Sequence, residues 1–450
     1  MNEIDNNHME TMNIKKLSLK VSIPMVISMI SIALYGIVDT VFISNIGANA
    51  LTAIALVFPI QNLITAIALG IGIGINSLLA KTLGEKNNKK ATEIIIHGFI
   101  LVFISWIFIL IFSFIGLENF FGMFTKNKQI KELGYSYLII LSTCSIGSLY
   151  QILFEKILEA HGKSKESMII QFSGAVINLI LDPILIFGYF GMPSLGIKGA
   201  AISSVIGQFA GVLFGLIIIL KNKIIERKYI NNIVINKEIV KDIYKVGIPT
   251  MILEAISSVI NLILNKILIS FSEAAVSLWG IYEQLQRFVL IIIYGLNYGM
   301  IPIIAYNWGA KIKSRVEECI KYFIKLSIIV TLIGALIFIV LPKQIISFYD
   351  VTEEILQIGI PAFRILALSF VFAGCSLVLS ATFQAFGNGT YSLIINLCRK
   401  IVIALPIILI FKNALGIYVI WYAFVIAEIL TTIIAIKLFR NVQKNIIEKM

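Results

Sequence analysis

Long apolar stretches recur from one end of this 450-residue chain to the other. Each is about 20 residues or longer, enough for an α-helix to cross a hydrocarbon core of roughly 30 Å. Hydrophobic residues make up 58% of the chain and charged residues only 14%, whereas charged residues are about 25% of soluble domains. We therefore expect an all-α polytopic membrane protein, and the alternation typical of a transmembrane barrel is absent.

The apolar pattern predicts twelve transmembrane helices, at residues 21–45, 52–79, 94–116, 133–157, 168–190, 195–220, 246–271, 276–307, 319–341, 355–385, 390–411 and 414–437. The longest connection, 221–245, is polar and basic, and none is large enough for a soluble domain. We expect a cytoplasmic N-terminus (1–20), an N-lobe (21–220), a cytoplasmic linker (221–245), a C-lobe (246–438) and a cytoplasmic C-terminus (439–450).

The basic residues predict the orientation in the membrane. Of the 37 Lys and Arg, 26 lie in or beside the two termini and the connections after even-numbered spans, and six lie beside the other connections. This positive-inside pattern places both termini and the linker in the cytoplasm and the chain in the cell membrane. The net charge of +12 thus reflects the orientation of the chain in the membrane, and we expect no nucleic-acid partner. The four Cys are scattered without metal-ligand spacing.

The chain repeats itself after half its length. A shift of 225 residues matches Pro24 with Pro249, Gly70 with Gly295 and "LEAHG" (158–162) with "FQAFG" (383–387). Near the end the shift becomes 220, where "LGIKGAAISSVIGQ" (195–208) faces "LGIYVIWYAFVIAE" (415–428). Because six is even, the two pseudo-symmetric six-helix lobes have the same orientation, as in the parallel repeats of transporters that work by alternating access.

Three segments resemble the multidrug and toxic compound extrusion (MATE) transporters. They are "IPMVISMISIALYGIVDTVFISNIGANALTAIALVFPI" (23–60), "NLILDPILIFG" (178–188) and "LGIKGAAISS" (195–204). The resemblance covers about residues 15 to 440 and is closest to the bacterial subgroup whose coupling site lies in the N-terminal lobe. It implies secondary active efflux of amphipathic, often cationic compounds in exchange for H⁺ or Na⁺, and so an antibiotic-resistance role as a multidrug antiporter.

Polar residues inside the N-terminal spans predict an ion site. At 1.5 Å per residue, Asp39 lies roughly 24 Å along the first span and Asp182 roughly 21 Å along the fifth, so the two carboxylates have similar depth. Asn178 shares the helix face of Asp182, and Ser204 reaches the same layer from the sixth span. The four residues make an oxygen cage suited to a coupling ion.

This cage has two possible occupants. A close pair of carboxylates in a low dielectric tends to hold a proton. Na⁺ could instead bind the same oxygens, with backbone carbonyls freed where Pro183 interrupts the fifth span. The alternative is that each Asp only hydrogen-bonds a neighbouring helix. We expect no other metal and no cofactor.

A substrate cavity between the lobes is expected to use apolar, aromatic and acidic side chains. Glu254 would favour cationic substrates, and the other candidates supply adaptable contacts: Met29, Tyr35, Gln61, Tyr282 and Tyr298.

The second half lacks the acids of the first. Leu264 or Asn265 stands where Asp39 would be, and "ALPII" (404–408) replaces "LDPIL". Some branches of the family that the chain resembles carry a cation site built from acids on helices 7 and 10. Here Glu254 lies about one turn too early for such a site and the tenth span carries Arg364 in place of an acid, so we expect the ion chemistry in the first half only. The remaining charges either line the cavity or form pairs between helices: Glu254, Glu428, Lys266, Arg364 and Arg399. Glu283 and Arg287 form an i,i+4 pair.

Other function classes find little support. The glycines at 70 and 74 lie in an apolar span, which favours close helix packing over a phosphate loop, so we expect no nucleotide. The sequence has no acidic DDxxD cluster for a membrane transferase, and we expect no enzyme. A lipid or lipid-linked oligosaccharide flippase of related architecture remains the alternative, and its cavity would be more strongly charged. We expect a monomer whose partners are small molecules and membrane lipids.

Overall fold

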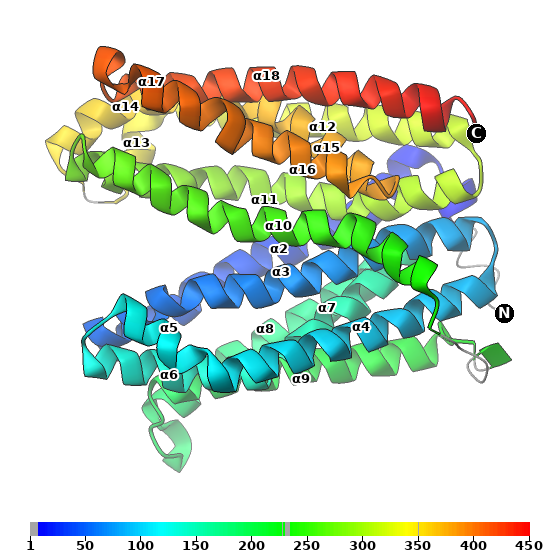
Figure 1. Ribbon diagram of the computed structural model, residues 1–450, viewed down its shortest axis with the longest axis horizontal. Coiled ribbons are helices and arrows are strands. Elements are labelled where there is room, and N and C mark those ends of the chain that lie inside the picture. The colour runs from blue at the N-terminus through cyan, green and yellow to red at the C-terminus, as the bar shows by residue number, and fades with distance from the viewer. Residues whose placement is uncertain (1–7, 227, 230–234, 350) are drawn as a thin grey trace. The chain divides into compact units, whose positions relative to one another are not determined.

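The computed structural model describes residues 8–226, 228–229, 235–349 and 351–450. Parts of the predicted N-terminal segment (1–7) and of the predicted linker (227 and 230–234) lie outside these residues. The described part of the chain consists of helices and the turns between them, without a strand (Figure 1).

The first half contains the helices α2 (Ile14–Ser44), α3 (Ala48–Gly84), α4 (Asn88–Ile115), α5 (Leu117–Phe124), α6 (Lys128–Thr143), α7 (Ile146–Ala160), α8 (Ser164–Phe187), the 3₁₀ turn η1 (Tyr189–Gly191) and α9 (Ile197–Lys221). The second half contains α10 (Lys237–Ile269), α11 (Glu273–Gly309), α12 (Lys313–Val340), α13 (Pro342–Ser347), α14 (Glu353–Ala367), α15 (Phe370–Ala385), α16 (Gly389–Leu397), the π-helix η3 (Cys398–Ala404), α17 (Leu405–Leu415), α18 (Tyr418–Val442) and the π-helix η4 (Gln443–Ile447).

These helices confirm the predicted spans. In the described residues, nine helices are long and apolar enough to cross a membrane, and two bent pairs raise the number to eleven. The 33-residue helix α10 coincides with the remaining predicted span, 246–271. Each predicted span thus has a helix or a bent helix pair.

Two spans that we predicted as single helices are broken in the structure. The pairs α6 with α7 and α14 with α15 each bend by 48°. At the breaks the Ser145 hydroxyl donates to the Ser142 carbonyl at 2.8 Å, and the Ser369 hydroxyl donates to the Leu366 carbonyl at 2.6 Å. Such hydroxyls take over carbonyls of the preceding turn and bend helices. The two breaks are separated by nearly the 225-residue shift of the repeat.

The chain folds into two compact units whose boundaries lie inside helices. One unit is formed by Ile27–Ala255, and the other by the described part of Asn7–Val26 together with Ile256–Met450. The boundaries fall within α2 and α10, not in the basic linker. The first part of each half's leading helix therefore belongs to the unit built mainly from the other half.

Glycines make these exchanged contacts possible. In the first unit, a Cβ atom at Gly70 of α3 would lie 2.7 Å from the carbonyl oxygen of Gly247 in α10. In the second unit, a Cβ atom at Gly295 of α11 would lie 2.6 Å from the Cα atom of Val26 in α2. Only glycine lets the backbones approach so closely. The predicted role of these repeated glycines in helix packing is confirmed.

Candidate functional site

The polar residues predicted for the ion site come together inside the first unit. They lie on α2, α8 and α9, and residues of α3 and α6 join them. The members of this cluster, which we call the ion cluster, are Tyr35, Asp39, Gln61, Tyr137, Asn178, Asp182, Ser203 and Ser204.

Close packing of α8 on α9 positions the centre of the cluster. A Cβ atom at Gly174 of α8 would lie 2.9 Å from the carbonyl oxygen of Gly207 in α9, and one at Gly207 would lie 2.5 Å from the carbonyl oxygen of Gly174. Gly188 ends α8 in the left-handed conformation, with φ +79°, which favours glycine. The following chain returns to α8, where the Leu195 amide donates to the Leu185 carbonyl at 3.0 Å. The side chains of both helices thus meet at close range.

Hydrogen bonds link the two helices at the level of Asp182. The Asn178 amide nitrogen donates to the Ser204 hydroxyl at 3.0 Å and to the Ser203 hydroxyl at 3.4 Å. The Ser203 hydroxyl donates to Oδ1 of Asp182. Asp182 is fully buried and Asn178 is 2% exposed. Burial away from water makes these bonds costly to leave unmade, so the network fixes the side chains.

Helices α2, α3 and α6 complete the cluster. The hydroxyls of Tyr35 and Ser204 are 3.3 Å apart, so α2 is hydrogen-bonded to α9. Asp39, half-buried one turn further along α2, interacts electrostatically with Asp182. From the other side, the buried Tyr137 of α6 hydrogen-bonds Gln61 of α3 and lies within electrostatic range of both carboxyls.

Three oxygens in the cluster are buried without a hydrogen-bond partner: Oδ1 of Asp39, Oδ1 of Asn178 and Oδ2 of Asp182. Among the described residues, no lysine or arginine acts on either carboxyl. Buried carboxylates need a proton or a cation to balance their charge. An all-oxygen set of this kind can take either a proton or a hard cation such as Na⁺.

The structure brings together all four predicted ion-site residues and adds two that the sequence did not single out. Ser203 and Tyr137 were missed. Tyr137 lies four residues into the inward-running fourth span, roughly 6 Å from its outer end. This depth matches that of Asp39, so the same depth estimate applied to the fourth span would have found it.

Two predicted cavity residues, Tyr35 and Gln61, lie in the ion cluster. Their partners are Ser204 and Tyr137 respectively. They thus lie beside the residues of the ion cluster, and a contact with substrate remains a prediction.

The other predicted cavity residues lie apart from the ion cluster. Met29 is half-buried in α2, Glu254 is exposed in α10, and Tyr298 is half-buried in α11. Tyr282 is 2% exposed and packs against aromatic rings in the core of the second unit, 5.2 Å from Trp279 and 5.8 Å from Phe363 between centroids. This packing does not support a cavity role for Tyr282 in the conformation described.

Helix α8 does not end at Pro183, contrary to the interruption that we predicted there. The helix continues to Phe187. Proline still removes one amide donor, so a carbonyl in the turn before it lacks its usual helical partner.

In the described part of the chain, no group of three or more His, Cys, Asp or Glu is arranged to hold a metal ion.

Comparisons with known proteins agree with this architecture. The sequence model of the MatE family matches residues 24–184 and 249–410, one segment in each half. The FAD transporter of Shewanella oneidensis is 26% identical over 409 residues, which cover 90% of this chain and 89% of that protein. The multidrug export protein MepA of Staphylococcus saprophyticus is 26% identical over 434 residues, which cover 95% and 94%.

A solved structure shows the same fold. An outward-facing multidrug resistance MATE family transporter superposes with a TM-score of 0.89 at 24% identity, and the match covers 98% of each chain. The predicted fold class, twelve transmembrane helices in two lobes, is confirmed.

Proposed function

The chain belongs to the MatE family of multi-pass membrane transporters, and from that premise we propose that it exports amphipathic or cationic small molecules in exchange for H⁺ or Na⁺. The family is one of transporters and not of enzymes. Alternating access of two lobes built from parallel repeats accounts for transport without a nucleotide site.

The observation that carries the proposal is the set of unpartnered oxygens in the ion cluster. Asp39, Asn178 and Asp182 each offer a buried oxygen that accepts no hydrogen bond. A proton or Na⁺ that binds there compensates one of the two negative charges of the carboxyls, and its release restores that charge. The site therefore distinguishes two states of the first unit, which is what coupling to an ion gradient requires.

Two kinds of cargo follow from the names of the relatives. MepA is named a multidrug export protein, and the protein of Shewanella oneidensis is named an FAD transporter. We favour the cationic, amphipathic class because Glu254, exposed on α10, supplies an acid. An anionic dinucleotide is the second candidate.

We also propose that the protein works as a monomer in the cell membrane, with both termini in the cytoplasm.

Purified protein in lipid vesicles tests this function. Vesicles loaded with a cationic dye are given a proton gradient and, separately, a sodium gradient, and dye release is recorded. We expect release under one gradient, and Asp39→Asn or Asp182→Asn should lower it to the level of protein-free vesicles. Glu118→Gln changes an acid of α5 in the same unit that lies outside the ion cluster, and it should leave release unchanged.

Several results would contradict the proposal. Full release by both aspartate variants would remove the ion cluster from the mechanism. Release with neither gradient would favour a flippase. Vesicles loaded with FAD identify the cargo, because release of FAD without release of dye would replace the cationic class by the dinucleotide.

A further inference from the structure

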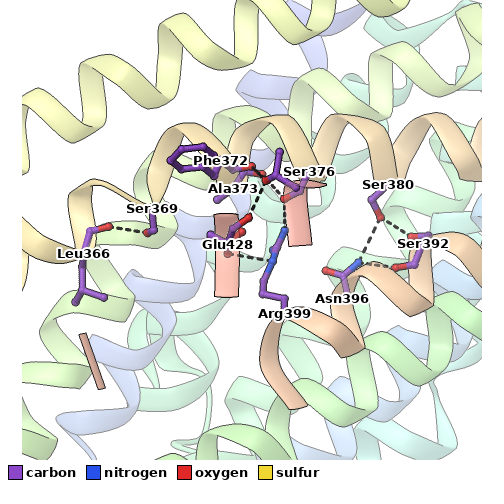
Figure 2. Close-up of polar contacts among 11 residues, drawn as sticks. Leu366, Ser369, Phe372, Ala373, Ser376, Ser380, Ser392, Asn396, Arg399 and Glu428 are labelled. Carbon is purple, nitrogen blue, oxygen red and sulfur yellow. Dashed lines mark hydrogen bonds and ion pairs between the residues drawn. The ribbon is translucent and has the colours of Figure 1, made fainter. Parts of the chain in front are cut away.

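The second unit holds a buried ion pair that is not part of the ion cluster. Arg399 of the π-helix η3 and Glu428 of α18 lie with Nε and Oε1 3.0 Å apart, and both side chains are 9% exposed. On its other side, Nη2 of Arg399 donates to the hydroxyl of Ser376 in α15 at 2.5 Å. Figure 2 shows Arg399 between Ser376 and Glu428, so that one guanidinium joins three helical segments.

This pair is poorly suited to a purely stabilising role. Removing two charges from water is expensive, and apolar residues of similar volume often stabilise a core as well as a buried ion pair does. Oε2 of Glu428 is buried with no hydrogen-bond partner among the described residues, and Nε of Arg399 is not aligned for a hydrogen bond although Oε1 is near. A pair kept only for stability would use both carboxylate oxygens.

The backbone at Arg399 is also unusual. Residues Cys398–Ala404 form a π-helix between α16 and α17. π-Helical segments are rare in proteins, and those that do occur are often found at functional sites. The adjoining α16 shares a network of neutral side chains with α15. The hydroxyls of Ser380 and Ser392 lie 2.6 Å apart, and the side-chain amide of Asn396 donates to the Ser380 hydroxyl at 3.3 Å (Figure 2).

The repeat shows that the scaffold does not need these charges. The 225-residue shift places Gly174 opposite Arg399 and Gln151 opposite Ser376, and the 220-residue shift places Gln208 opposite Glu428. In the first unit these neutral residues pack closely, since a Cβ atom at Gly174 would lie 3.6 Å from the amide nitrogen of Gln151. The first unit fills the same position without an ion pair, so the charges serve a purpose specific to the second unit.

We propose that Glu428 is a second proton-binding carboxyl of this transporter, with Arg399 as its built-in counter-cation. The unpartnered Oε2 accepts the proton. A proton suits this position better than Na⁺, because a proton needs only the one unpartnered oxygen, whereas Na⁺ needs several oxygen ligands; the guanidinium 3.0 Å away opposes both cations electrostatically.

The neighbouring groups set a balance at Glu428. Burial favours its protonated form, whereas Arg399 and Lys400, both in the π-helix, and a hydrogen bond with Ser376 favour its ionised form. Glu428 in turn acts on Tyr282 of α11. Helix α15 contributes the neutral Ser376. Arg364 of α14 is exposed and donates to the Ile339 carbonyl, away from Glu428, and Lys412 lies in the last turn of α17.

Protonation of Glu428 leaves Arg399 as a buried cation without its anion. Such a charge is strongly destabilising until it finds another partner or water. The contact of α18 with η3 and α15 therefore changes when the proton arrives. The second unit thereby acquires its own response to pH, independent of the ion cluster and of the cargo.

Infrared difference spectroscopy on the full chain in lipid vesicles tests the proposal. The C=O stretch of a protonated buried carboxyl is followed from about pH 4 to about pH 9, a range that covers free and buried glutamates. The background is the Asp39→Asn, Asp182→Asn double variant, which removes the acids of the ion cluster. Other buried glutamates, such as Glu155 and Glu159, contribute carboxyl bands in this background. We expect one pH-dependent component, the Glu428 band, to be lost when Glu428→Gln is added.

A paired variant guards against misfolding. Because Glu428→Gln alone leaves Arg399 as a buried cation without its anion, the combination Arg399→Gln with Glu428→Gln removes both charges, so that the position is neutral as in the first unit, and this variant should elute as the wild-type protein does in size-exclusion chromatography. Loss of the band in this paired variant supports the proposal. Arg399→Gln alone should keep the band but move the pH at which it appears by about 1 unit or more.

The proposal is overturned if the carboxyl band is the same with and without Glu428, or if no such band is seen between the two pH limits. Because the measurement needs no transport, its result stays separate from that of the dye-release experiment.

Discussion

At the residue scale, the ion cluster shows how a buried carboxyl can be held in place by one oxygen while its other oxygen stays without a partner. Oδ1 of Asp182 accepts a hydrogen bond from the Ser203 hydroxyl, and Oδ2 has no partner among the described residues. The bonded oxygen fixes the carboxyl, and the open oxygen remains available to an ion. Glu428 has the same division, with one oxygen beside Arg399 and one unpartnered. Half-satisfied carboxyls thus occur in both units, in different helices.

A residue outside the spans predicts an acid-sensitive stability. His161 lies in the turn between α7 and α8, where Nδ1 contacts the Ile157 carbonyl at 2.8 Å, and burial lowers the pKa of its imidazole from 6.5 to about 4. The unfolded chain therefore takes up this proton at higher pH than the folded chain. Stability should fall as the pH decreases from about 6.5 to about 4.

Thermal unfolding of the purified protein at pH 7 and pH 5 measures this effect. We expect His161→Gln to reduce the loss of Tm between the two pH values, because glutamine binds no proton in this range. His8→Gln is the matched control. An equal loss of Tm in wild type and in His161→Gln would contradict the prediction.

The composition of the ion cluster could be predicted from sequence as far as single helices determine it. The rise per residue placed Asp39 and Asp182 at one depth, and four-residue spacing placed Asn178 beside Asp182. Tyr137 was missed although its depth in the fourth span was predictable, and Ser203 was missed because its role depends on which helix packs against which. Glycines at the α8–α9 contact set that packing, and only the folded chain shows how close they allow the two helices to come.

At the scale of elements, helix existence was predictable and helix continuity was not. The apolar runs gave every span, but neither 48° break contains a proline or a glycine between its two helices. The breaks depend on hydroxyls that bond to carbonyls of their own turn, as Ser145 and Ser369 do. Serine does the same in many unbroken helices, so its presence alone predicts no bend.

The glycine contacts predict a test of helix packing. A Cβ atom at Gly74 would collide with the Ile243 carbonyl oxygen, and a backbone oxygen cannot move aside as a flexible side chain can. We expect Gly74→Ala to destabilise the protein by about 1–3 kcal/mol. Gly280→Ala is the control, since that exposed position in α11 has nothing within 4 Å, and alanine there should stabilise by about 0.5–1 kcal/mol.

Thermal unfolding in detergent measures both substitutions. Gly74→Ala should lower Tm, and Gly280→Ala should leave it unchanged or raise it. A Tm for Gly74→Ala equal to that of the wild type would show that α3 and α10 are not held together at this glycine.

At the scale of the whole molecule, the repeat was visible in the sequence and the unit boundaries were not. Matched prolines and glycines revealed the two halves. The assignment of residues to units depends instead on contacts, such as those of Arg315 with the carbonyls of Met9 at 2.9 Å and Met12 at 2.8 Å. These contacts join residues about 300 positions apart, and no local sequence pattern predicts them.

The basic residues predict the orientation of the whole chain. In a variant whose four native Cys are replaced by Ser, Met192→Cys, in the turn between α8 and α9, should react in intact cells with a membrane-impermeant maleimide. Lys237→Cys, at the start of α10, should react only after the cells are made permeable. Both native side chains are exposed, so access in the protein is comparable. The reverse labelling pattern would contradict cytoplasmic termini.

The exchanged helix starts have a consequence for the order of biosynthesis. The glycine face of α3 is closed by the beginning of α10, which the ribosome makes only after all the other helices of the first unit. Chains usually fold domain by domain from the N-terminus as they emerge. Here the first unit stays incomplete in the membrane until synthesis has entered the second half. A nonsense mutation near residue 237 would therefore spoil the packing of helices that had already been made.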